Sequence, residues 1–529
     1  MKKLFTLIAA LGLTMGAMAA DYTDNLEVNV KTGNKVVTSN QEATINVTKN
    51  NDGTYNFSLK DFHFGELSLG DVSLNNIPAT EQNGKVYLNA DQNVRVKLFP
   101  TPLPIKLRAE LRNNEAKMYA SMDITVALIH QDVNVIFGSG YQIPNSGFED
   151  FHTEILHNFD FETGAWTADI KKSASVPNAW HSFMSATGWG YAQDDEGNNK
   201  YGNWPSIVYL ASGMIEPHTY ISDEIRPGST GKHSAKVVAR DAFIAIANGT
   251  MTTGRMNTGS TTPTDYANHA WLDTDSTGVD EHGDPFYTEM SGLPDSLAVW
   301  VKYNQKTPNA EHPYATVSAA ITDGTYYQEP DSKTYKNVLA LARNNKIEAT
   351  GKDWKRIVIP FTVQNKDVNG KAILVTISTN ADAGQGSDKD SILVDDINLI
   401  YNDPTNVKID WNDAAATRVG NSVISPDNIN VTYDGAIGAK VVKSLKQDGD
   451  NVVATVTVFN GDLTKQIDQE THTYEGAVTG IKAIDLSDAK TTDAPTEIYS
   501  ISGQRVSDMQ PGQVYIVKKG DKVVKVLKK

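Results

Sequence analysis

The feature that most constrains the fold of this chain is the alternation of apolar and polar residues, which recurs over most of its 529 residues. A period of two places successive side chains on opposite faces of a β-strand, whereas an amphipathic helix needs a period near 3.6. The alternation is almost continuous from residue 21 to about 140, for example in 55–59, 105–111 and 133–137. The sequence therefore predicts an all-β fold.

Residues 21–140 are expected to form a small antiparallel barrel. Asn51-Asp52-Gly53 separates two apolar runs and is a strong hairpin signal. A meander of about eight strands leaves exposed edges unless it closes. The segment resembles the calycin-like barrels of secreted Bacteroides-type proteins, although Gly53-Thr54-Tyr55 is only a loose counterpart of the lipocalin Gly-x-Trp. Both a filled interior and an apolar ligand cavity fit a barrel of this size.

The first twenty residues have the organisation of a secretory signal peptide. Lys2 and Lys3 precede an apolar run, and Ala17-Met18-Ala19 offers small residues for cleavage after Ala19 or Ala20. No later segment reaches ~18 consecutive apolar residues, so no transmembrane segment is expected in the mature protein. We predict a secreted or cell-surface protein.

Composition excludes several classes of partner and site. The net charge of −16 argues against binding nucleic acid. The absence of cysteine excludes disulfides, thiolate metal sites and a cysteine nucleophile.

Residues 141–403 are expected to form a large β-sandwich with long loops, of the jelly-roll type. Strands are predicted at 206–210, 235–239, 296–303, 316–322, 355–362, 372–379 and 391–400. The segment Tyr335–Arg343 is interpreted as a helix, because Val338, Leu339 and Ala342 would share one face.

The opening and closing segments of this region carry a resemblance. Asn145-Ser146-Gly147-Phe148-Glu149, Gly231-Lys232-His233-Ser234-Ala235 and Val394-Asp395-Asp396-Ile397 resemble the carbohydrate-metabolism domain of secreted Bacteroides-type proteins. More distantly, the region is similar to jelly-roll carbohydrate-binding modules. This resemblance implies a role connected with carbohydrate.

The remaining residues are expected to form two small β-domains, a spacer at 404–480 and a terminal domain at 481–529. In the second, strands are predicted at 497–501, 514–518 and 523–527. Its motifs Gly503-Gln504-Arg505-Val506 and Val514-Tyr515-Ile516-Val517 and its lysine-rich end resemble the sorting domain of the type IX secretion system. The resemblance implies outer-membrane secretion machinery as a partner; without it, a periplasmic location remains.

Four aromatic residues are candidates for stacking against sugar rings, because they lie in or beside polar loops. These ligand-binding candidates are Trp189, Trp204, Tyr209 and Trp271. Packing in the core is the alternative interpretation, and it is the stronger one for Trp300 and Trp354, which lie in or beside apolar strands.

An acidic loop is a candidate calcium site. Asp273, Asp275 and Asp284 repeat the spacing of a calcium-binding hand, with Gly278 between them. The flanking sequence is not helical, so a solvated acidic loop is the alternative.

A second candidate calcium site comes from the resemblance to carbohydrate-binding modules. It implies a structural calcium that joins Glu149 to Asp395 or Asp396. In the alternative, Glu149 caps a turn and Asp395 accepts backbone N–H groups.

No catalytic signature is present, and His152 and His157 are interpreted as surface histidines. We therefore predict non-enzymatic glycan binding at the cell surface. The alternatives are carriage of an apolar ligand in the barrel, a structural or adhesin-like role, and a glycoside hydrolase whose carboxylate pair the sequence does not reveal.

Overall fold

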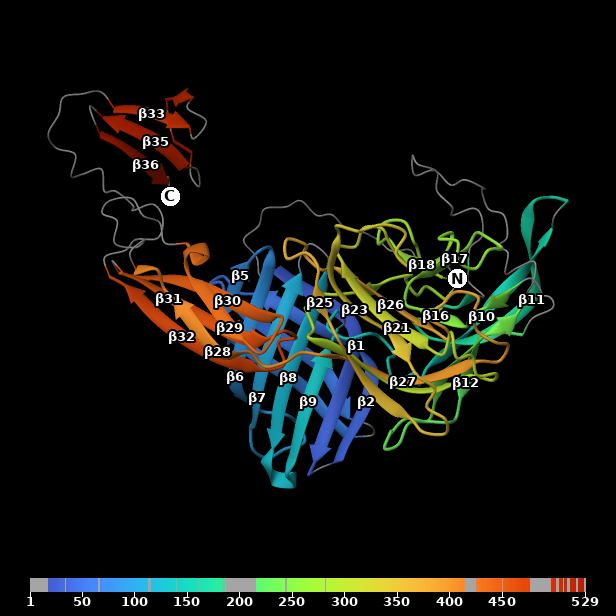
Figure 1. Cartoon of the computed structure of the whole chain (residues 1–529). Coiled ribbons are helices and arrows are strands. Elements are labelled where there is room, and N and C mark those ends of the chain that lie inside the picture. Colours follow the sequence, from blue (N-terminus) through green and yellow to red (C-terminus); the bar gives the residue numbers. More distant parts are fainter. Residues whose placement is uncertain are drawn as a thin grey trace. The chain divides into compact units, whose positions relative to one another are not determined.

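The computed structural model describes residues 18–475 and 496–527, except 34, 65–66, 113–115, 139, 161, 184–185, 187–215, 243–244, 281, 414–424, 450, 501–503, 508, 511–513 and 520–521. Its elements are strands, apart from 3-10 turns at Ala127–Ile129 and Pro426–Asn428. The predicted all-β fold is confirmed (Figure 1). No helix in the described part of the chain is long and apolar enough to cross a membrane.

The chain forms two compact units. The first comprises Met1–Pro404 together with Gly435–Lys440 and Phe459–Lys465, and the second comprises Thr405–Asp434, Val441–Val458 and Gln466–Lys529.

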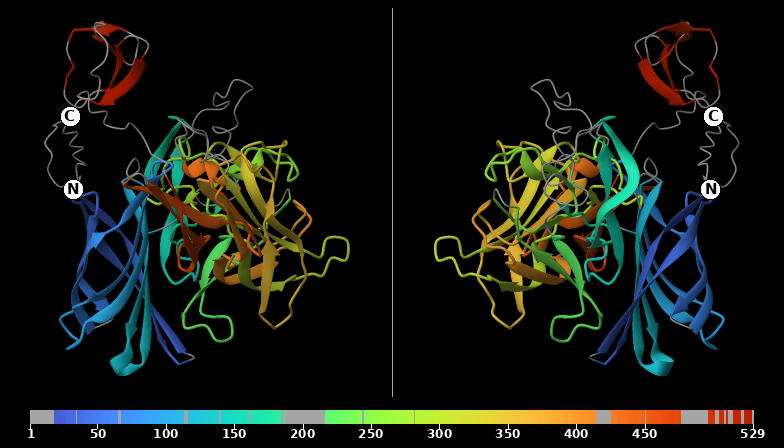
Figure 2. Two further views of the ribbon diagram at one scale, coloured as in Figure 1. Left: turned by 90° about the vertical axis from the view of Figure 1, so that its left-hand side faces the viewer. Right: turned by 90° about the vertical axis from the view of Figure 1, so that its right-hand side faces the viewer.

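The first nine strands form one antiparallel sheet that curves into a nearly closed barrel (Figures 1 and 2). In spatial order they are β4 (Leu67–Ile77), β3 (Tyr55–Phe64), β2 (Lys35–Lys49), β1 (Met18–Thr32), β9 (Gln131–Phe137), β8 (Lys117–Val126), β7 (Leu103–Arg112), β6 (Lys85–Val94) and β5 (Ala79–Gln82).

The alternation of apolar and polar residues explains which side chains fill the barrel interior. Val133, Val135 and Phe137 of β9 are buried, and the residues between them are partly exposed. The inward side chains of all the long strands form one contiguous apolar cluster. Near the two ends of the sheet, Asn75 of β4 exchanges hydrogen bonds with the Gln92 side chain of β6 at 3.3 and 2.8 Å. The inward side chains of the barrel therefore pack against one another.

The following region contains two antiparallel sheets that share one core. The five-stranded sheet has the order β12 (Thr219–Ser222), β13 (Ser234–Val238), β27 (Ser391–Ile400), β20 (Ser296–Asn304) and β24 (Lys355–Pro360). The six-stranded sheet has the order β16 (Thr250–Thr252), β26 (Ala372–Ser378), β21 (Ala315–Thr322), β23 (Val338–Ile347) and β25 (Thr362–Val363), and β19 (Thr288–Glu289) also pairs with β26.

The core between these sheets confirms the predicted sandwich. Val299 and Val394 of the five-stranded sheet belong to the same buried cluster as Val317 and Val375 of the six-stranded sheet. The predicted strands at 235–239, 296–303, 316–322, 355–362, 372–379 and 391–400 are all present within a few residues, and 206–210 lies outside the described residues.

The helix expected at Tyr335–Arg343 is wrong. The residues from Val338 onward form strand β23, in the interior of the six-stranded sheet. Val338, Leu339 and Ala340 are buried in succession, because both faces of the strand are covered there. A strand covered on both faces loses its alternation and cannot be distinguished by period from a short buried helix.

Smaller sheets complete the fold. In the sandwich region these are β10 (Phe151–Asp160) with β11 (Ala165–Pro177), β14 (Arg240–Asp241) with β15 (Ile246–Ala247), and β17 (Arg255–Thr258), β18 (Asn268–Leu272) and β22 (Tyr327–Glu329). Later strands are β28 (Thr405–Asp410) with β29 (Asn430–Asp434), and β30 (Ala439–Asp448), β31 (Asn451–Asn460) and β32 (Gln466–Tyr474).

The terminal residues form a four-stranded sheet. Its strands are β34 (Arg505–Val506), β33 (Thr496–Ser500), β35 (Val514–Lys519) and β36 (Lys522–Leu527). The three predicted strands are confirmed, and the short β34 is added to them.

Candidate functional site

One part of the outer face of the six-stranded sheet is polar, whereas Ala320, Val338 and Leu374 belong to a second apolar cluster beside it. In β21, Val317 and Ala319 point into the core, so Thr316 and Ser318 lie on the opposite face. The register places Ser318 opposite both Thr376 of β26 and Arg343 of β23. Residues directly opposite each other share a face. Three strands therefore contribute hydroxyl and guanidinium groups to one surface.

This polar surface is the floor of a cleft with a volume of about 670 Å³. Its walls come from residue 242, residues 245–248, residues of β17 and β18 with the loop between them (256–270), and the loop 380–385. Tyr266 on the rim keeps 54% of its surface exposed. A volume of this size lies within the range typical of small-molecule sites.

An ion-pair group of Arg343, Glu329 and Asp331 contributes to the lining of the cleft. The Arg343 guanidinium lies 2.5 Å from Glu329 Oε2 and 3.0 Å from Asp331 Oδ2. Burial raises the pKa of Glu329, although Arg343 and the Tyr327 hydroxyl, 2.6 Å away, favour the ionised form. Glu329 is thus held by protein partners.

Two histidines of the cleft are also held in place. Burial lowers the pKa of His269 to about 4, so its ring is neutral at pH 7. Its Nδ1 lies 2.7 Å from the Tyr266 carbonyl oxygen and its Nε2 lies 3.2 Å from the Tyr326 hydroxyl. His312 Nδ1 lies 2.8 Å from Asp382 Oδ2.

Three buried polar atoms of cleft-lining residues have no hydrogen-bond partner within the described part of the chain. They are Asn248 Oδ1, Asn257 Oδ1 and Thr258 Oγ1. A buried polar atom without a partner costs roughly 1–3 kcal/mol. All three atoms are closed to solvent, so they add nothing to the surface that the cleft presents.

The predicted aromatic residues fall in two groups. Trp189, Trp204 and Tyr209 lie outside the described residues. Trp271, in β18, is only 4% exposed and packs against Tyr326 with ring centroids 5.5 Å apart. Its neighbours His269 and Ala270 line the cleft. In this structure the Trp271 ring offers no face for a sugar to stack on.

The acidic-loop residues point in different directions. Asp275 is exposed, and Asp273 Oδ1 accepts a hydrogen bond from the Asp275 N–H. Asp284 Oδ2 accepts a hydrogen bond from the Ala179 N–H at 2.7 Å. Within the described residues, Asp284 belongs to a possible cation-binding group with His152 and Asp280, and neither Asp273 nor Asp275 takes part.

Glu149, Asp395 and Asp396 are held by a basic side chain and by backbone groups. Glu149 accepts hydrogen bonds from the Lys232 and His233 N–H groups at 2.8 and 3.3 Å. Asp395 accepts one from the Arg226 N–H at 3.1 Å, and Asp396 pairs with the Arg226 side chain. Burial raises the pKa of Asp395 to about 6. A calcium ion at these residues stays a prediction.

Sequence reasoning did not find the cleft. Thr316, Ser318, Thr376 and Ser378 follow the alternation of their strands, which predicts that they share faces within each strand. The alternation does not predict that Arg343, which lies in a segment interpreted as a helix, shares a surface with these four residues.

A comparison with protein families supports the barrel prediction. Residues 18–139 match the family model described as a calycin-like β-barrel domain. No curated protein matches the chain.

Solved structures show distant likenesses. A candidate glycoside hydrolase from Bacteroides thetaiotaomicron is 13% identical, with a TM-score of 0.31, and the match covers 62% of this chain and 94% of that one. A candidate outer membrane protein from Bacteroides fragilis is 8% identical, with a TM-score of 0.18, over 68% of this chain and 96% of that one. Likenesses at these TM-scores carry no argument about activity.

Proposed function

We propose that this protein binds glycan in the cleft on the six-stranded sheet and does not cleave it. The observation that carries the proposal is the polar floor built from Thr316, Ser318, Arg343 and Thr376 beneath walls from β17, β18 and loops. Sugars present many hydroxyl groups, and such groups are recognised by hydroxyl, amide and guanidinium side chains.

The partly exposed Tyr266 supports the proposal. An exposed aromatic ring at a rim can cover the apolar face of a sugar ring while the floor binds its hydroxyls.

A hydrolase is the second candidate at the same site. Glycoside hydrolysis needs two carboxyl groups on opposite sides of the scissile bond. Glu329 and Asp382 both line the cleft. Each is bound to a basic side chain, Glu329 to Arg343 and Asp382 to His312. These contacts hold both carboxyl groups in place, which suits positioning a ligand.

The test is a glycan-array and affinity-gel screen of the protein with a cleft-blocking variant, Thr316→Trp. The matched control is Val358→Trp, which adds the same side chain at a 48% exposed position of β24 in the other sheet. We expect binding by the wild type and the control, at least tenfold weaker binding by Thr316→Trp, and no shortened products. Equal binding by all three proteins would overturn the cleft as the site, and release of shortened glycan would favour the hydrolase.

Export to the cell surface is part of the proposal. It is supported by the signal-like first twenty residues and by the motifs of residues 481–529 that resemble a type IX sorting domain.

A further inference from the structure

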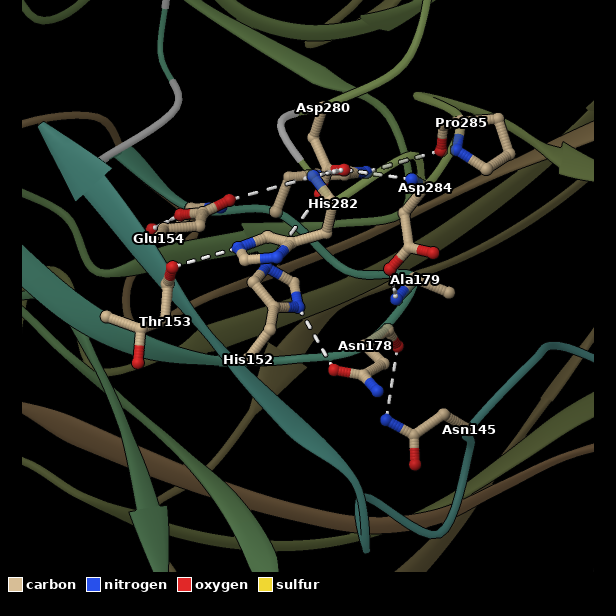
Figure 3. A network of polar contacts seen from close by, with 12 residues as sticks. Asn145, His152, Thr153, Glu154, Asn178, Ala179, Asp280, His282, Asp284 and Pro285 are labelled. Carbon is tan, nitrogen blue, oxygen red and sulfur yellow. Dashed lines mark hydrogen bonds and ion pairs between the residues drawn. The ribbon is translucent and has the colours of Figure 1, made fainter. Parts of the chain in front are cut away.

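A group of histidine and carboxylate side chains lies apart from the cleft, where three segments meet (Figure 3). His152 and Glu154 are two residues apart in β10 and so share a face. His181 follows β11 and forms an isolated bridge with Thr252. Asp280 and Asp284 come from a loop closed by the bridge between Val279 and Pro285.

These side chains are buried. The side-chain exposure is 8% for His152, 4% for Asp280 and 0% for His181. The interpretation of His152 as a surface histidine is therefore wrong, because the acidic loop covers β10 at this point. Figure 3 shows His282 of that loop bound to β10 through the Thr153 carbonyl oxygen, at 3.0 Å.

Outer contacts fix the orientation of both imidazoles. His152 Nδ1 lies 3.1 Å from Asn178 Oδ1, and His181 Nε2 lies 3.3 Å from the Pro285 carbonyl oxygen. Oxygens of this kind only accept, so each of these ring nitrogens donates. In the neutral rings, His152 Nε2 and His181 Nδ1 therefore present lone pairs.

Hydrogen bonds from the backbone fix the orientation of the Asp280 carboxylate. Its Oδ1 accepts hydrogen bonds from the His282 and Asp284 N–H groups, both at 2.8 Å. Its Oδ2 lies 3.8 Å from His152 Nε2 and 3.9 Å from His181 Nδ1. Among the described residues, none of these three atoms has a hydrogen-bond partner. Both ring nitrogens thus face the same carboxylate oxygen with no donor from the described part of the chain between them, an arrangement that requires a cation or an added proton.

We propose that His152, Asp280 and Asp284 bind a divalent transition metal of the zinc type, with His181 as the fourth ligand. Zinc bonds of 2.0–2.1 Å in a tetrahedron separate ligand atoms by about 3.4 Å. The distances from Asp280 Oδ2 to His152 Nε2 and to His181 Nδ1, 3.8 and 3.9 Å, exceed this by a few tenths of an ångström. The ligand atoms of His152, Asp280 and Asp284 lie within 4.8 Å of one another, and Glu154 Oε1 lies 3.7 Å from His181 Nδ1.

The donor set selects the metal. Two imidazole nitrogens favour zinc and its neighbours over calcium, which prefers oxygen ligands alone. The second contacts of both histidines, to Asn178 and to the Pro285 carbonyl, are of the kind that orient metal-binding imidazoles. The metal would fasten β10, the segment after β11 and the acidic loop to one another, so its role is structural.

The experiment uses the full chain, stripped with a chelator and dialysed. Zinc binding is measured by competition with a chromophoric chelator, and cobalt(II) is added separately to record its visible spectrum. The variants are His152→Gln and His181→Gln. The control is His63→Gln, at a histidine of the barrel whose side chain is 36% exposed.

We expect one tight equivalent of zinc per chain in the wild type and the control, and at least a hundredfold weaker binding in both site variants. Cobalt should give the intense absorption of a four-coordinate site in the wild type. Equal binding by all four proteins, or a cobalt spectrum no different from that of the free aqueous ion, would overturn the proposal. The cobalt spectrum needs only the wild type, so the proposal stays testable if a variant fails to fold.

Discussion

At the scale of single residues, burial fixes the protonation of groups that would otherwise titrate near neutral pH. His218 is 1% exposed, and its Nδ1 lies 3.0 Å from the Val238 carbonyl oxygen. Burial lowers the pKa of this histidine to about 4. The folded protein therefore holds His218 neutral at pH values where the unfolded chain would protonate it.

This shift predicts a pH dependence of stability. The folded-state pKa of His218 lies below the unfolded value of about 6.5. Its contribution to the free energy of unfolding is therefore complete above pH 6.5 and is lost as pH falls toward 4. The loss between pH 7.5 and 4.5 should be about 2–3 kcal/mol for this one group. Chemical unfolding at the two pH values, compared between wild type and His218→Gln, measures it.

The variant should show a correspondingly smaller difference between the two pH values, and the exposed-histidine variant His63→Gln should behave as the wild type does. An unchanged pH difference in His218→Gln would contradict the assigned shift.

At the scale of elements, β7 carries a buried charge that depends on several partners. Glu110 is 0% exposed and lies 2.9 Å from both Lys85 and Arg112, 3.3 Å from Lys440 and 2.8 Å from the Tyr141 hydroxyl. Burial opposes ionisation of Glu110, but the three cations outweigh it and hold its pKa well below the usual range. The carboxylate thus joins β6, β7, the segment after the barrel and the segment 435–440.

Glu110→Gln should destabilise the protein by about 3–5 kcal/mol, because it leaves buried cations without their counter-charge. The control is Glu81→Gln, which removes a carboxylate that is 66% exposed and 2.8 Å from Lys49. An exposed pair of this kind contributes about 0–1 kcal/mol. Thermal unfolding of both variants makes the comparison, and similar midpoints would count against the Glu110 network.

At this scale, the sequence predicts most of the strands but not the contacts between distant segments. Alternation predicts the barrel, where most strands have one covered and one wetter face. The strands at 316–322 and 372–379 are predicted as well, although nearly all residues of β21 and β26 are buried. Alternation failed at β23, which is covered on both faces from Val338 to Ala340. It also could not bring together Ser318, Arg343 and Thr376, or His152 and Asp280, since strand pairing between distant segments decides those contacts.

At the scale of the whole molecule, the chain is an all-β protein with a polar cleft on one sheet. The two ends of the chain give a prediction of their own. If residues 1–20 are a signal and 481–529 a sorting domain, the native surface protein should begin near Ala20 or Asp21 and lack about the last 45 residues. Terminal peptide mapping of protein taken from the cell surface tests this, and an intact carboxy-terminal segment there would exclude the sorting interpretation.

The most direct test of the central claim is a calorimetric titration of one array-selected oligosaccharide into the wild type, Thr316→Trp and Val358→Trp. We expect saturable binding near one site per chain in the wild type and in the β24 control. Thr316→Trp should lose at least tenfold in affinity, because the new indole occupies the polar floor beside Ser378. Unchanged affinity in Thr316→Trp, with all three proteins equally folded, would contradict the assignment of the cleft.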